Sequence, residues 1–61
     1  MNLQQAIDKA QQVAKKKRET IYVVWERGVE GYQIATDIDL DTHFSGCAPE
    51  ATVEPNGEIS W

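Results

Sequence analysis

Apolar residues in the first third of the chain recur at steps of three and four positions. The series consists of Leu3, Ala6, Ile7, Ala10, Val13 and Ala14. This spacing gathers side chains on one side of a helix, so it predicts an amphipathic α-helix over residues 2–18 with a buried stripe. Asn2 is a favourable N-cap, and Gln5 three positions later can complete a capping box with it.

After Thr20, the spacing of the apolar residues changes from the helical period to a period of two residues. The segment IYVVWE alternates and is rich in β-branched and aromatic residues, which is typical of a strand. We predict one strand over residues 20–26 and a second over 31–38, joined by the glycine-flanked turn RGVEG. The hairpin register then places Trp25 opposite Tyr32 and Val23 opposite Ile34. Both strands turn these residues toward the helix, so Trp25 is expected in the core.

The acidic segment TDIDLD can be interpreted in two ways. Its aspartates occupy every second position with Ile38 and Leu40 between them, which favours continuation of the strand to about residue 38. The alternative is a short helical turn near residues 39–46, capped by an aspartate and stopped by Gly46. A calcium-binding loop starting at Asp37 would need glycine at its sixth position and glutamate at its twelfth. The chain has Thr42 and Ala48 there, which argues against calcium.

The C-terminal segment contains a strong turn signal, Pro-Asn-Gly at 55–57, because proline presets φ and glycine accepts left-handed geometry. We predict short strands over residues 51–54 and 58–61 around it, with Trp61 stapling the last strand to the core. The complete prediction is one α+β domain, residues 1–61, in which the N-terminal helix packs on one face of a small antiparallel sheet.

Charge divides the chain into two parts. Residues 1–20 hold five basic and two acidic side chains, a net charge of +3, whereas residues 21–61 hold one basic and eight acidic side chains, a net charge of −7. The basic run comprises Lys15, Lys16, Lys17 and Arg18. Nucleic-acid binding through this run is an alternative function, but the acidic remainder would repel such a ligand, so we expect none.

The sequence lacks the patterns of an enzyme or of a metal protein. Cys47 is the single cysteine and His43 the single histidine, and a structural zinc site takes about four ligands of these types. A thiol or metal site at Asp39, His43 and Cys47 is therefore the least favoured alternative, and we expect no catalysis, cofactor or metal. The sequence has one lone thiol, and it contains no membrane-spanning apolar run and no signal-peptide pattern. These features favour a cytoplasmic protein.

A single helix can cover only one face of a sheet, so we expect the other face to bind a protein partner or a second copy of the chain. An apolar patch rimmed by carboxylates is typical of such a surface. The predicted partner-binding residues are Tyr22, Val24, Ala35, Asp37, Asp39 and Asp41.

In size, acidity and economy, the chain resembles small phage- or prophage-encoded accessory proteins that bind and inhibit a host enzyme or defence complex. The resemblance covers the general character of the whole chain and rests on no motif. It implies an inhibitor or regulator and transfers no functional residue to this sequence.

Overall fold

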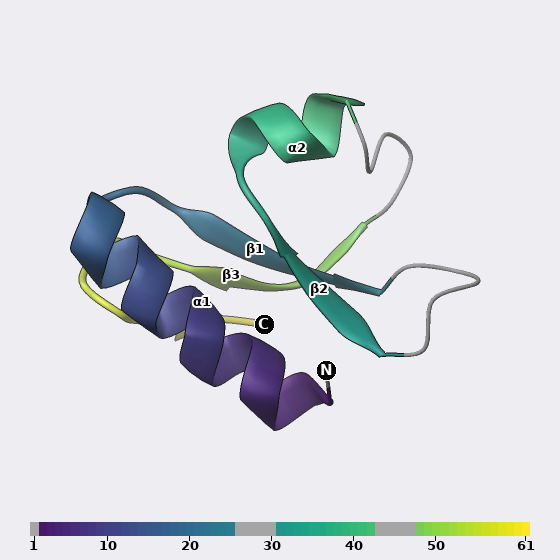
Figure 1. The fold of residues 1–61 in the computed structure, drawn as a ribbon, viewed down its shortest axis with the longest axis horizontal. Helices are drawn as coiled ribbons and strands as arrows, with labels where there is room; N and C mark the ends of the chain where they lie inside the picture. Colours follow the sequence, from purple (N-terminus) through teal and green to yellow (C-terminus); the bar gives the residue numbers. More distant parts are fainter. Residues whose placement is uncertain (1, 26–30, 43–47) are drawn as a thin grey trace.

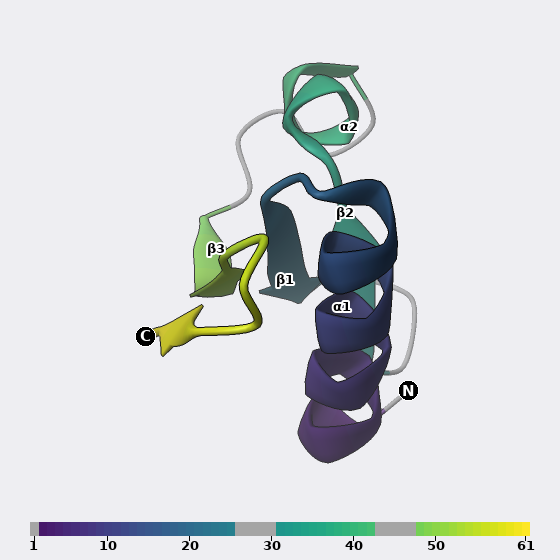
Figure 2. The same ribbon diagram turned by 90° about the vertical axis from the view of Figure 1, so that its left-hand side faces the viewer.

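The computed structural model describes residues 2–25, 31–42 and 48–61 and has an α+β fold, as predicted. In these residues, helix α1 packs against one face of an antiparallel sheet with strand order β2-β1-β3-β4, and a short helix α2 follows β2 (Figure 1). The elements are α1 (Leu3–Lys17), β1 (Ile21–Trp25), β2 (Tyr32–Ala35), α2 (Asp37–Thr42), β3 (Pro49–Val53) and β4 (Ile59–Ser60). Figure 2 shows α1 alongside the sheet and α2 beyond the end of it.

Helix α1 begins with the predicted capping box. The backbone N–H of Gln5 donates to Asn2 Oδ1 at 2.8 Å, and the backbone N–H of Asn2 donates to Gln5 Oε1 at 3.1 Å. The helix ends at Lys17, and its C-cap Arg18 has a left-handed backbone (φ 55°) and donates its N–H to the Ala14 carbonyl oxygen. In the described ranges, no helix combines the length and apolarity needed to cross a bilayer.

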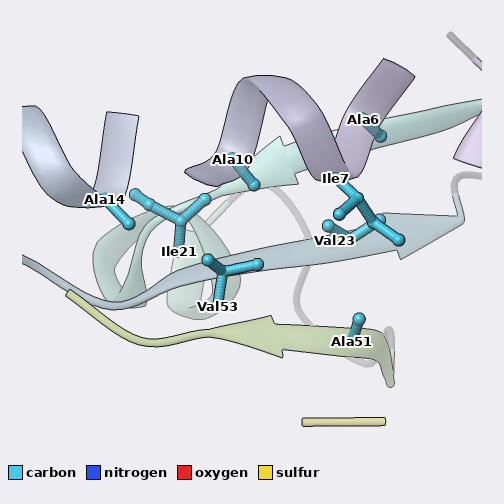
Figure 3. Close-up of a cluster of buried hydrophobic side chains, with 8 residues drawn as sticks. All are labelled: Ala6, Ile7, Ala10, Ala14, Ile21, Val23, Ala51 and Val53. Carbon is cyan, nitrogen blue, oxygen red and sulfur yellow. The ribbon is translucent and has the colours of Figure 1, made fainter. Parts of the chain in front are cut away.

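The core consists of small and β-branched side chains between α1 and the sheet (Figure 3). Its buried members are Ala6, Ile7, Ala10, Ala14, Ile21, Val23, Ala51 and Val53. Alanines on α1 let the helix approach the sheet closely, and the branched strand residues fill the space between them. Each fully buried valine or isoleucine contributes about 1.5–3 kcal/mol relative to exposure.

The first hairpin has the predicted register, with Trp25 opposite Tyr32 and Val23 opposite Ile34. The prediction that Trp25 is buried is wrong, because its side chain is 51% exposed. On β1 the core cluster reaches Val23 but not Trp25, the last residue of the strand. The indole packs edge-on against the ring of Tyr32 instead, with 5.1 Å between ring centroids.

The second hairpin confirms the turn predicted at Pro-Asn-Gly. The N–H of Gly57 donates to the Glu54 carbonyl oxygen at 2.8 Å, and Gly57 has φ 92°. Strand β3 starts at Pro49, earlier than predicted, since proline is tolerated at the first residue of a strand. Strand β4 is shorter than predicted and excludes Trp61. The prediction that Trp61 staples the last strand to the core is wrong, because its side chain is 75% exposed. Ile59 packs on the core instead.

The preference for a strand to residue 38 is wrong, because β2 ends at Ala35 and α2 follows. Thr36 caps this helix. The N–H of Asp39 donates to Thr36 Oγ1, and the N–H of Thr36 donates to Asp39 Oδ2, both at 3.2 Å. This reciprocal pair is a capping box with aspartate as its acidic member. The alternative prediction, a helical turn near residues 39–46, has the correct element type. Its start and its aspartate cap are wrong, because α2 begins earlier and Thr36 caps it. The predicted stop at Gly46 lies outside the described residues.

Candidate binding surface

The sheet face opposite α1 is less exposed than the sequence predicts. Val24 and Ala35 are buried, at 0% and 1% exposure, and only Tyr22 of the three predicted apolar residues stays partly exposed. Val24 lies in β1 between its partners Gln33 on β2 and Pro49 on β3. Ala35 lies where the chain turns into α2, which contacts β2. The open apolar patch expected on this face is therefore absent at these two positions.

The predicted row of aspartates is also absent, because the segment is helical. Alternate residues share one side of a strand, but in a helix they lie about 200° apart around the axis. Asp37 and Asp41 are exposed on α2, whereas Asp39 is partly buried and occupied with the cap at Thr36. The six predicted partner-binding residues thus separate into buried, capping and exposed positions.

Tyr22 and Asp37 are brought together by the two neighbouring strands. Tyr22 pairs with Ala35 on one side and with Thr52 on the other. Asp37 follows Ala35 by two positions, and Glu54 follows Thr52 by two, so a carboxylate flanks the phenol from each side.

Hydrogen bonding to the Asp37 carboxylate, together with desolvation and the negative charges of Asp37 and Glu54, raises the pKa of Tyr22 above its ordinary value of 10.0. The phenol is neutral at physiological pH, as it would be with its ordinary pKa, and the upward shift moves its ionisation further into the alkaline range.

A hollow of about 270 Å³ lies beside this pair. It is lined by Glu19, Thr20, Thr36, Asp37 and Ile38. The connection between α1 and β1 forms one wall, and Thr36 with the first two residues of α2 forms the other. Ile38 is 73% exposed. The hollow therefore combines an exposed aliphatic side chain, two hydroxyl groups and two carboxylates.

Sequence reasoning identified Tyr22 and Asp37 for this surface but missed Glu19, Ile38 and Glu54. The signal for α2, and hence for the position of Ile38, was the capping-box pattern Thr36-x-x-Asp39. The contribution of Glu54 depends on the register between β1 and β3, for which the local pattern gives no signal.

The residues of the other candidate sites are not among those that line the hollow, or they fall outside the described residues. Lys15, Lys16 and Lys17 form the last turn of α1, and the Lys15 side chain lies over Gly57. His43 and Cys47, proposed as an alternative metal or thiol site, fall outside the described residues. Among the residues that the structure does describe, no group of three or more histidine, cysteine, aspartate or glutamate side chains could hold a metal ion.

No protein-family model matches this chain, and comparisons with curated proteins and with solved structures found no match.

Proposed function

We propose that this chain is a small, acidic, non-catalytic protein-binding module, acting as an inhibitor or regulator of another protein. The observation that carries the proposal is the surface around the hollow, where the exposed side chain of Ile38 lies beside the Tyr22–Asp37 pair. An apolar anchor surrounded by carboxylates gains affinity from the burial of its aliphatic surface. The carboxylates add discrimination between partners through charge complementarity.

The chemistry of the surface supports binding rather than turnover. The pKa of Tyr22 is raised, further from physiological pH, whereas the pKa of a catalytic base or nucleophile is tuned toward the operating pH. The carboxylates of Asp37 and Glu54 place negative charge near the phenol. These groups present fixed polar contacts to a partner. We also propose a cytoplasmic location, because a single cysteine suits a reducing compartment.

Affinity capture from a cell lysate with paired variants tests this function. Ile38→Glu adds a charge at the proposed anchor, and Gln12→Glu adds the same charge on the exposed side of α1. We expect both variants to retain the fold, since exposed substitutions usually change the free energy of unfolding by less than about 0.5 kcal/mol. Ile38→Glu should lose a partner that Gln12→Glu retains, because loss of an anchor costs about 2 kcal/mol or more of binding free energy.

Identical capture by the two variants, or capture of nothing by the unmodified chain, would refute the proposed surface.

A further inference from the structure

The outer edge of β2 is open for pairing in the part of the chain that the structure describes. The strand lies at the end of the sheet order β2-β1-β3-β4 and pairs with β1 on its inner side. No described residue outside this ladder makes a backbone hydrogen bond to residues 32–35. An edge strand presents a row of N–H and C=O groups that can pair with another chain. The edge of β2 is therefore a template for an added strand.

Strand β2 also lacks the charges, proline and bulge by which many natural edge strands avoid such pairing. Its sequence, YQIA, contains no charged residue and no proline, and the register irregularity of the sheet lies between β1 and β3. The opposite edge strand, β4, has two residues and is too short to offer a ladder. Protection at one edge and its absence at the other indicate that β2 is the edge available to a partner.

Charge identifies the kind of partner. Every charged side chain in residues 31–42 and 48–61 is acidic, and the basic side chains of the described residues lie on α1 and at its C-terminus. Asp37 lies two residues after the end of β2 and lines the hollow together with Glu19. A second copy pairing through β2 would bring another acidic β2–α2 region to this one. A basic segment of a different protein would bring the complementary charge.

We propose that the free edge of β2 takes up an extended segment of alternating apolar and basic residues from a protein partner. The inference rests on the proposed function and specifies its partner. Tyr32 and Ile34 pack toward the core beneath α1, so apolar side chains of the added strand lie beside them. Its basic side chains lie on the opposite face, beside Gln33 and Ala35, with one of them reaching Asp37 at the end of the strand.

The probe is a synthetic nonapeptide of alternating valine and lysine with blocked ends. One control peptide carries glutamate in place of lysine, and a second carries proline in place of valine, which removes backbone donors. Peptide affinity is measured by fluorescence anisotropy, and the site is located from backbone amide shifts in NMR spectra. We expect the lysine peptide to bind and shift the amides of residues 32–35, and neither control peptide to bind.

Matched variants test the role of charge at the end of the strand. Asp37→Asn and Asp41→Asn remove the same charge from exposed positions on α2. We expect Asp37→Asn to weaken binding of the lysine peptide about two- to fivefold, the range of an exposed ion pair. Asp41→Asn should leave the affinity unchanged. Thermal unfolding of each variant checks that the fold is retained.

Several results would overturn the inference: no binding of the lysine peptide, equal effects of the two variants, or amide shifts confined to α1. Shifts of residues 32–35 that depend on protein concentration alone would show that a second copy takes the edge. If peptide binding fails while Ile38→Glu still loses a captured partner that Gln12→Glu retains, the edge-strand inference fails and the proposed function stands.

Discussion

The side-chain amide of Gln11 donates a hydrogen bond of 3.0 Å to the carbonyl oxygen of Gly57, which ties the middle of α1 to the turn between β3 and β4. The bond is partly buried and joins residues 46 positions apart. Its acceptor lies in the turn that positions Ile59 for packing on the core. A single side chain therefore couples the first element of the fold to the last hairpin.

Gln11→Ala should lower the free energy of unfolding by about 0.5–1.5 kcal/mol, the usual net contribution of one hydrogen bond. Gln12→Ala is the matched control, because Gln12 is exposed on the same helix. Its replacement by alanine changes the helix propensity by the same amount as Gln11→Ala does. Urea unfolding of both variants measures the difference. Equal stability of the two variants would show that the bond to Gly57 contributes nothing.

Gly57→Ala should cost about 1–3 kcal/mol of stability, because φ 92° is strained for a residue with a Cβ atom. A Cβ at this position would also overlap the Lys15 side chain. The same substitution in a Lys15→Ala background separates the two causes. A smaller cost there assigns the difference to the Lys15 contact, and an unchanged cost assigns all of it to the backbone.

Thr36→Ala should destabilise α2 by about 0.5–2 kcal/mol, the usual range for loss of an N-cap. Thr36→Ser keeps the oxygen that accepts from the Asp39 N–H and should restore most of this stability. Amide hydrogen exchange of residues 37–42 reports the effect locally. Equal exchange in the alanine and serine variants would contradict the assignment of Thr36 as the cap.

Alkaline pH should weaken the fold through Tyr22. Its pKa is raised above 10.0 in the folded chain, so the folded state holds the proton more tightly than the unfolded state. The resulting stabilisation is fully present below pH 10.0 and is lost as the pH rises from there through the folded-state pKa. Ultraviolet titration in a Tyr32→Phe background should give a raised pKa for Tyr22.

Asp37→Asn should bring that pKa back toward 10.0, because the hydrogen bond to the Asp37 carboxylate is its largest cause. Glu54→Gln should have a smaller effect in the same direction, since Glu54 contributes charge alone. A Tyr22 pKa that is the same in the Asp37→Asn variant would show that the phenol and this carboxylate do not interact.

Trp61→Ala should change stability by about 0.5 kcal/mol or less, because the side chain is 75% exposed. Ile59→Ala is the comparison, since Ile59, two residues earlier on β4, is partly buried against the core. We expect it to cost clearly more, toward the lower end of about 2–5 kcal/mol for a buried isoleucine. A larger loss for Trp61→Ala would restore the stapling role first expected of this tryptophan.

Local patterns in the sequence were sufficient to predict α1 and both hairpins. The capping box at Asn2 and Gln5 and the turn at residues 55–57 depend on residues close together in the chain. The period-two alternation also fixed the register of Val23 and Trp25 against β2, because a slip by one residue would move every apolar side chain to the wrong face. Period alone misassigned residues 37 and 38, where the capping interaction of Thr36 with Asp39 outweighed the alternation.

The sequence by itself thus determined that the chain has an amphipathic helix, two hairpins and an α+β arrangement. Only the tertiary structure decided which side chains are exposed and which carboxylates meet. Trp25 lies outside the core while Val24 and Ala35 lie buried, because burial depends on where neighbouring elements end. Asp37 and Glu54 flank Tyr22 because β2 and β3 pair on opposite sides of β1. The pairing of β1 with β3 joins segments distant in the chain, and its register is set by packing of the whole sheet.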